Sequence, residues 1–306
     1  MKPKVFLEFV EFQSLVASVL PFTLGLLYVW YNYHAFNLLH SVLFFIVIEL
    51  MHMAVNANDN TQDFVHAKDE KTFKQLTNVV GHYHISLRLA ITVIVSLSAS
   101  AAIIGFGLLK LTWGSSSWIF LGMGIIGFLV GYFYAGGPLP ISNTPFGELF
   151  SGVTMGYVIM LAAVYVNLAP AQQLSWSLAG NVLLASGLAV FAIGNLMLAN
   201  NLCDYGEDKL NERRTIVVLL GQRVMLWAWN IGYALGYVCM VAAVLVGTLP
   251  KLTLLALLIV PVVIKNNRQF GAVMVKSKSF VLAVKNCILI TISFALAMGI
   301  GIIFHL

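Results

Sequence analysis

Long runs of apolar residues dominate the chain and are separated by short polar segments. Each run extends over about 20 residues, the length that an α-helix needs to cross the hydrocarbon core of a bilayer. The runs are unbroken rather than alternating, so they predict membrane-spanning helices and exclude an outer-membrane β-barrel. We expect nine spans, at about residues 14–31, 38–57, 87–109, 117–135, 149–168, 180–200, 223–247, 252–264 and 284–304.

The composition agrees with this pattern. Hydrophobic residues make up 60% of the 306 residues, charged residues make up 9%, and the mean hydropathy is +0.90. Soluble domains are about a quarter charged, so a soluble globular protein, a disordered chain and a nucleic-acid binder are all excluded. Membrane lipid is therefore an expected partner and nucleic acid is not. The three cysteines have no metal-ligand spacing and predict neither a disulfide framework nor a zinc site.

The basic residues indicate how the spans are oriented. With nine spans, Lys110 and Lys251 lie on one side of the membrane, and every other Lys and Arg lies on the opposite side. Cytoplasmic loops carry the excess of Lys and Arg. The sequence therefore predicts a cytoplasmic N-terminus and a C-terminus across the membrane. No segment indicates a second domain, so residues 1–306 are expected to form a single membrane domain.

The acidic residues gather in two short stretches at the cytoplasmic ends of the second and sixth predicted spans. Aligned with an offset of 145 residues, both stretches read N-x-x-D-x-x-x-D-x-x-x-x-[K/R]. The matched pairs are Asn56 with Asn201, Asp59 with Asp204, Asp63 with Asp208, and Lys68 with Arg213. Positions i, i+3 and i+7 share one helix face, so each stretch aims an amide and two carboxylates at one patch. If the two helices face each other, four carboxylates converge.

Four carboxylates at one patch need a cation, because bare carboxylates repel one another. Mg²⁺ takes oxygen ligands and bridges carboxylates to substrate phosphates. Basic residues beside the motifs would then bind phosphate oxygens: Lys68, Lys71, Lys209, Arg213 and Arg214. The pattern predicts a diphosphate site at which Mg²⁺ stabilises the leaving group. The alternative is that these charges are ordinary solvated helix caps and interfacial anchors.

The second predicted span carries a polar stripe from mid-membrane to its cytoplasmic end. Its members follow at helical spacing: Glu49, His52, Asn56, Asp59 and Asp63. Ionisable residues inside a span usually face a cavity and mark a substrate path. A Glu49–His52 pair satisfied within the bundle is the alternative. Asn195 is polar at a similar depth in the sixth span and could face the same cavity.

The loop after the fourth predicted span is rich in glycine, proline and aromatic residues. It runs from Tyr132 to Glu148 and contains the segment Gly136-Gly137-Pro138-Leu139-Pro140. These residues favour a rigid, irregular turn over a flexible linker. Such a loop could hold a flat aromatic acceptor over a cavity, or it could be a plain tight turn between helices.

These motifs resemble the UbiA superfamily of intramembrane prenyltransferases over nearly the full length of the chain. In that superfamily two Asp-rich motifs, N-D-x-x-D and D-x-x-x-D, lie on helices two and six of a nine-helix bundle. The run from Asn200 through Asp208 to Arg214 looks like the second motif. The Gly-Gly-Pro-Leu-Pro segment, followed by Gly147-Glu148, is similar to the menaquinone branch, the 1,4-dihydroxy-2-naphthoate polyprenyltransferases. The implied fold is an all-α membrane bundle around a central cavity.

The first motif departs from the superfamily pattern by one residue. When Asp63 is used as the anchor, Asp59 occupies the usual Asn position and Asn60 occupies the usual Asp position. The internal repeat keeps Asp59 on the metal-facing side. Asp59 therefore stays an expected metal ligand, and Asn60 is expected to share that role.

The resemblance also implies a mechanism, in which two Mg²⁺ ions hold a polyprenyl diphosphate. The implied metal ligands and catalytic residues are Asp59, Asp63, Asp204 and Asp208, with Asn60 as a further ligand. The implied substrate-binding residues are Asn56, Asn200, Asn201, Lys68, Lys209, Arg214, Tyr134, Glu148 and Glu49. Aromatic rings such as Tyr134 and Phe64 would stabilise an allylic carbocation. The cation would alkylate dihydroxynaphthoate with loss of CO₂ and give demethylmenaquinone. Glu49 and Glu148 are candidate bases.

Three alternatives stay open at this point. A superfamily member with another acceptor, such as 4-hydroxybenzoate or a haem or chlorophyll precursor, would keep both Asp motifs and change the acceptor loop. A cation or metabolite transporter would place charges near the bilayer midplane, usually with inverted repeats, whereas this repeat is parallel and lies at helix ends. A purely structural or receptor-like bundle would leave the paired acidic faces without a role.

Overall fold

The computed structural model describes residues 1–66, 78–171 and 173–304. Over these residues the chain is helical and contains no β-strand. The elements are α1 (Pro3–Phe9), η1 (Phe12–Leu15), α2 (Val16–Tyr33), α3 (Leu38–His66), α4 (Val79–His82), α5 (Leu87–Leu111), α6 (Ser117–Ala135), η3 (Ile141–Asn143), α7 (Gly147–Ser151), η4 (Gly152–Val158), α8 (Ile159–Leu168), α9 (Trp176–Cys203), α10 (Tyr205–Leu210), α11 (Ile216–Leu220), α12 (Gln222–Leu245), η5 (Lys251–Ile259), α13 (Val260–Val273) and α14 (Lys276–Ile303).

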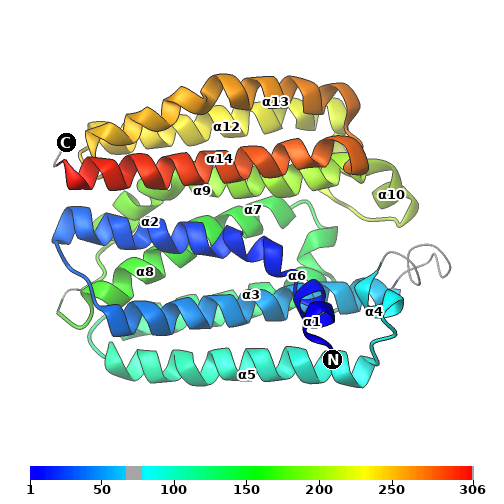
Figure 1. Cartoon of the computed structure of the whole chain (residues 1–306), viewed down its shortest axis with the longest axis horizontal. Coiled ribbons are helices and arrows are strands. Elements are labelled where there is room, and N and C mark those ends of the chain that lie inside the picture. The colour runs from blue at the N-terminus through cyan, green and yellow to red at the C-terminus, as the bar shows by residue number, and fades with distance from the viewer. Residues whose placement is uncertain (67–77, 172, 305–306) are drawn as a thin grey trace.

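Within the described ranges, eight helices are long and apolar enough to cross a membrane. They coincide with eight of the nine predicted spans. The remaining predicted span, residues 252–264, is divided between the 3₁₀-helix η5 and the α-helix α13. These two elements follow one another along α12 and α14 (Figure 1). The prediction of nine spans therefore depends on whether η5 and α13 together cross the membrane.

Large apolar side chains cover the outside of the bundle. Trp176 is 95% exposed, and Trp118 and Ile103 are each 72% exposed. Only 11% of the most apolar 18-residue stretch of α5 is buried inside the protein. A surface of this kind is stable against lipid and would be strongly unfavourable in water. The chain is a multi-pass membrane protein.

Glycines let the central helices approach closely. A Cβ atom on Gly25 of α2 would lie 2.7 Å from the Ala163 Cβ of α8. A Cβ on Gly156, in the π-helical turn η4, would lie 2.6 Å from the Val190 Cα of α9. Helix association in membranes relies on close packing of this kind, because lipid tails are as apolar as the side chains. These contacts fix α2, the α7–η4–α8 segment and α9 as the centre of the bundle.

Buried amides join the helices of the C-terminal half. Asn195 of α9 donates from Nδ2 to the Trp229 carbonyl oxygen at 2.9 Å, and Trp229 Nε1 donates to the Asn195 carbonyl oxygen at 2.9 Å. The sequence suggested that Asn195 could face a polar cavity. The structure places it in the packed interior instead, because this reciprocal pair with α12 uses its amide group.

The polar end of the bundle collects the short helices. Figure 1 shows α1, α4 and α10 at the same end, to which α3 and α9 also run. The C-terminal end of α14 lies at the other end of the bundle, far from this region (Figure 1). The two acidic stretches are therefore brought to one end of the bundle by helices that are remote in sequence.

Candidate active site

The two Asp-rich motifs occupy different local structures. The first lies entirely on α3, which continues to His66, so Asp59 and Asp63 share a helix face as predicted. The second was predicted to lie on one helix, but α9 ends at Cys203 and Asp208 belongs to α10. Asp204 stands at the junction and accepts a hydrogen bond from Asn200 Nδ2 at 3.1 Å. Asp favours helix boundaries because its side chain forms local hydrogen bonds of this type.

Arg213 joins the two motifs. Its guanidinium nitrogens lie 3.6 Å from Asp63 Oδ1 and 3.5 Å from Asp208 Oδ1. The Thr215 hydroxyl donates to the other oxygen of Asp208 at 3.3 Å. Burial raises the pKa of the Asp208 carboxyl above its usual range, and the Arg213 charge counteracts that shift. One cation thus holds carboxylates from both halves of the repeat at one place.

Lys276 supplies a second cation, which the sequence reasoning missed. Its Nζ atom lies 2.6 Å from Asp204 Oδ2. The charges of Lys276 and Arg213 also act on Asp59 and Asp63. Lys276 is the first residue of α14, far along the chain from either motif. Its place among the basic residues of the predicted cytoplasmic side was the only signal in the sequence that pointed toward the site.

The N-terminal segment closes against the first motif. Asn56 Nδ2 donates to the Val10 carbonyl oxygen at 2.9 Å and to Ser14 Oγ at 2.8 Å. Asn60 Nδ2 lies 3.2 Å from Glu11 Oε1 and from the Phe9 carbonyl oxygen. Both amide NH₂ groups therefore hold the turn around Glu11, a residue with φ of 48°. This use of Asn60 was not foreseen, because nothing local in the sequence links it to residues 9–11.

The glycine- and proline-rich loop packs against the second motif. Asn201 Nδ2 donates to Glu148 Oε1 at 2.8 Å, and the Arg214 backbone N–H donates to the Asn143 carbonyl oxygen at 3.0 Å. Tyr134, at the end of α6, lies within electrostatic reach of Asp59 and Glu148. The loop is therefore a fixed wall of the site, hydrogen-bonded to Asn201 of the second motif.

The family model of the UbiA prenyltransferase family matches residues 18–302. The chain belongs to the UbiA prenyltransferase family. It is similar to the 1,4-dihydroxy-2-naphthoate octaprenyltransferase of Bacillus subtilis (strain 168), with 35% identity over 147 residues. That alignment covers 48% of this chain and 45% of the relative, so less than half of the relative's length is matched.

Solved UbiA structures share the fold. A UbiA homolog from Aeropyrum pernix K1 in its apo form has a TM-score of 0.68 and 21% identity, with 94% of this chain and 97% of that chain covered. A UbiA homolog from Archaeoglobus fulgidus bound to GPP and Mg²⁺ has a TM-score of 0.63 and 14% identity, with 97% and 99% covered. At these identities the likeness establishes the UbiA fold.

At its mid-membrane end, the polar stripe on α3 belongs to a hydrogen-bonded group inside the bundle. Ser18 of α2 lies 2.7 Å from Glu49 Oε1 and 2.9 Å from His52 Nδ1. Ser18 is fully buried. The geometry supports the interpretation of Glu49 and His52 as polar residues satisfied within the bundle, with Ser18 as the partner that the sequence did not reveal.

The remaining predicted basic residues are Lys209, Arg214, Lys68 and Lys71. The Lys209 ammonium lies 5.2 Å from the centre of the Tyr205 ring, a cation–π contact on α10. Arg214 contributes the backbone contact described above. Lys68 and Lys71 fall outside the described residues.

The donor atoms fit a hard divalent cation. In the described part of the chain, no three His, Cys, Asp or Glu side chains lie close enough together to hold a metal ion jointly. Instead, Asp63 and Asp208 share Arg213, and Asp204 pairs with Lys276. These three aspartates present carboxylate oxygens, which are the ligands that Mg²⁺ prefers. These paired carboxylates are therefore chemically suited to Mg²⁺.

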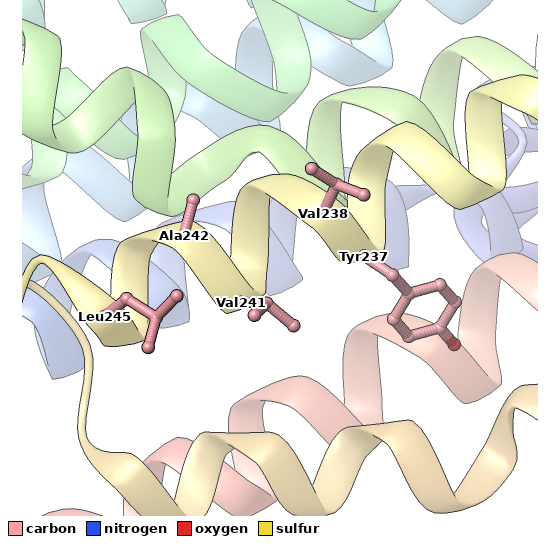
Figure 2. Close-up of a pocket in the computed structure, with 5 residues that line it drawn as sticks. All are labelled: Tyr237, Val238, Val241, Ala242 and Leu245. Atoms are coloured by element: carbon pink, nitrogen blue, oxygen red, sulfur yellow. The ribbon is translucent and has the colours of Figure 1, made fainter.

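An open apolar groove with a volume of about 320 Å³ lies on the surface away from this site. Its lining residues are Tyr237, Val238, Val241, Ala242 and Leu245, all on α12, as Figure 2 shows. The lining residues lie toward the end of α12 that is far from Gln222, whereas the Gln222 side chain bonds to the Leu202 carbonyl oxygen near the second motif. The groove is thus separate from the Asp-rich site.

Proposed function

We propose that this protein transfers a polyprenyl group from polyprenyl diphosphate to 1,4-dihydroxy-2-naphthoate. The reaction releases diphosphate and CO₂ and gives demethylmenaquinone. The observation that carries the proposal is the contact of one guanidinium, Arg213, with Asp63 of the first motif and Asp208 of the second. It brings carboxylates for Mg²⁺ and a cation for phosphate to one place.

Similar proteins support both substrates. The Archaeoglobus fulgidus homolog was solved with GPP and Mg²⁺, and also with DMAPP and Mg²⁺. The Bacillus subtilis relative is a 1,4-dihydroxy-2-naphthoate octaprenyltransferase. From these properties we infer that prenyl diphosphate binds at the Asp-rich motifs of this chain and dihydroxynaphthoate at the neighbouring loop.

Different residues of the site bind the metal ions and the diphosphate. Asp59, Asp63, Asp204 and Asp208 would hold two Mg²⁺ ions, with Asn60 beside them. Bound Mg²⁺ supplies Lewis-acid stabilisation of the diphosphate leaving group. Other residues bind the diphosphate oxygens: Arg213, Lys276, Lys209, Arg214, Asn200 and Asn201. Positive charge at fixed positions stabilises the negative charge that develops as the allylic C–O bond breaks.

The prenyl group then meets the aromatic ring. The C–O electron pair leaves with the diphosphate, and the allylic carbon forms a C–C bond with the electron-rich ring carbon that carries the carboxylate. Loss of CO₂ restores aromaticity. Tyr134, at the end of α6, would stabilise the allylic cation with its ring face. The apolar tail lies among the helices or in lipid.

In the membrane, the chain crosses nine times and the site opens to the cytoplasm, with η5 and α13 together forming the eighth crossing. The distribution of Lys and Arg supports this arrangement. A variant lacking the three native cysteines allows a direct test. A cysteine at position 251 should react with an impermeant maleimide in intact cells, and one at position 278 only after permeabilisation. The reverse result would overturn the orientation.

A membrane assay tests the reaction itself. Membranes containing the protein receive radiolabelled polyprenyl diphosphate, 1,4-dihydroxy-2-naphthoate and Mg²⁺. We expect a demethylmenaquinone product that is lost with EDTA and in the Asp208→Asn variant. Transfer to 4-hydroxybenzoate but not to the naphthoate would overturn the assignment of the acceptor. Absence of transfer to any aromatic acceptor would overturn prenyl transfer as the function.

A further inference from the structure

Two buried oxygen atoms in the loop region form no hydrogen bond with another described residue. They are Glu148 Oε2 and Asn143 Oδ1. Among the described residues five buried side-chain polar atoms have no partner, and the other three lie on α12 and η5. Leaving a buried acceptor unpaired costs free energy. A pair of such atoms beside an Asp-rich site therefore needs an explanation.

Both residues are held in place through their other polar groups. Asn201 of the second motif binds Glu148 Oε1 at 2.8 Å and leaves Oε2 without a partner. The Arg214 backbone N–H binds the Asn143 carbonyl oxygen at 3.0 Å and leaves the side-chain amide oxygen without one. A Cβ on Gly147 would lie 3.6 Å from the Ile141 carbonyl oxygen and 3.9 Å from Tyr134 Oη. The loop, α7 and the end of α6 are therefore packed together.

The chemistry of the two atoms selects the ligand. Both are hydrogen-bond acceptors, so a ligand must offer donors. A diphosphate offers only acceptor oxygens at neutral pH and would be repelled by Glu148. A dihydroxylated aromatic ring offers hydroxyl hydrogens and a flat apolar face, which suits a wall containing Tyr134.

The geometry points to Glu148 and Asn143 as the residues that bind the hydroxyl groups of the aromatic acceptor. This inference rests on the proposed function and assigns the acceptor's position within the same site. Glu148 accepts a hydrogen bond from one ring hydroxyl and Asn143 from the other. The acceptor's carboxylate then points away from Glu148, because like charges repel. A hydrogen bond to a carboxylate also increases electron density in the ring that attacks the prenyl carbon.

Steady-state kinetics on the full-length protein in lipid vesicles test this assignment. Glu148→Gln keeps an oxygen for Asn201 and removes the charge. We expect KM for dihydroxynaphthoate to rise about tenfold or more, as for loss of a charged hydrogen bond, while KM for polyprenyl diphosphate stays within about twofold. Glu8→Gln, at a half-buried residue paired with Lys4, is the matched control and should change neither constant. An equal rise in both constants, or no rise for the acceptor, would overturn the assignment.

Asn143→Leu separates binding from structure. The Asn143 amide oxygen has no partner, so a merely structural role predicts unchanged or higher thermal stability and an unchanged KM. We expect unchanged or higher stability together with a raised KM for the acceptor. Naphthoates that lack one hydroxyl extend the test. One analogue lacks the hydroxyl that Glu148 binds. For that analogue, the KM values of the wild type and Glu148→Gln should agree within about twofold. If the KM values of the wild type and Glu148→Gln still differ with each of the two monohydroxy analogues, the assignment is overturned.

Equilibrium binding keeps this inference distinct from the proposed function. Quenching of dihydroxynaphthoate fluorescence measures acceptor binding without turnover. If the wild type binds the acceptor more tightly than Glu148→Gln but transfers no prenyl group, the proposed reaction fails and the acceptor site stands. If the wild type transfers prenyl groups but Glu148→Gln binds the acceptor equally well, the reaction stands and the site assignment fails. If the wild type binds no dihydroxynaphthoate, both fail.

Discussion

The two Asp-rich motifs have the same spacing in the sequence but are built differently in the structure. The first is one face of a continuous helix, α3, whereas the second crosses the junction between α9 and α10. In the first motif, the amide of Asn56 holds the N-terminal segment through Val10 and Ser14. In the second, the matching amide of Asn201 holds Glu148 of the acceptor loop.

The cations are also distributed unequally. Arg213 follows the second motif and Lys276 begins α14, so both described cations that contact the aspartates come from the C-terminal half. Within the described residues, the first motif contributes the Asn60 amide, which contacts Glu11, and the Asp63 carboxylate, which contacts Arg213. A repeat in sequence thus gives two complementary halves, one that is braced by the N-terminal turn and one that supplies positive charge.

The largest expected effect comes from removing one carboxylate from each half. Asp63→Asn and Asp208→Asn should each lower the rate of prenyl transfer by about 10³-fold, because each removes a charged ligand of the diphosphate-bound metal. Rates from single-turnover assays with saturating Mg²⁺ measure this. Glu212→Gln, a nearby acidic residue outside the matched positions, is the control. If either Asp variant kept more than a tenth of the activity, the two halves would not act as one site.

Substitutions of Arg213 should have the next largest effect on prenyl transfer, because Arg213 contacts both halves of the site. Arg213→Gln removes the charge and should reduce kcat/KM for polyprenyl diphosphate by about 100-fold. Arg213→Lys keeps the charge but cannot match the guanidinium fork that reaches Asp63 and Asp208 together, so we expect a loss of about tenfold. Equal activities for the two variants would show that the charge alone matters and that the bridging geometry does not.

Lys276 tests the contribution of α14. Lys276→Gln removes the partner of Asp204, and KM for polyprenyl diphosphate should rise about tenfold. Lys278→Gln on the same helix, where the side chain is exposed, is the matched control and should leave KM unchanged. A similar rise in both variants would indicate a general surface-charge effect rather than a specific contact at the site.

The smallest expected effect concerns the unusual residue of the first motif. Asn60→Asp restores the carboxylate that other superfamily members have, yet we expect no gain in activity. The introduced carboxylate could not donate a hydrogen bond to Phe9 or Glu11 and would repel Glu11, so thermal stability in detergent should fall by about 1 kcal/mol. Adding Glu11→Gln should recover most of that loss. Higher activity or tighter Mg²⁺ binding at unchanged stability would show that Asn60 acts as a weakened ligand instead.

The sequence by itself determined the membrane bundle and the repeat. Apolar runs of the length of a bilayer leave a helix as the favourable conformation, because every backbone polar group must be satisfied within the segment. This reasoning places eight spans where the structure has them, and it departs from the structure where η5 interrupts the α-helical pattern. Helical spacing likewise placed Asp59 and Asp63 on one face.

Only the tertiary structure decided which groups meet at the site. The Asp63–Arg213 pair, the Asp204–Lys276 pair and the Asn60–Glu11 contact join residues that lie far apart in the sequence. Local periodicity specifies which face of a helix is polar, but not which distant residue comes to lie opposite it. That choice depends on how the helices pack, through contacts such as Gly25 against Ala163 and Gly156 against Val190. Packing is a property of the whole bundle, so the cations, the buried Ser18 and the unpaired oxygens of the loop became visible only in three dimensions.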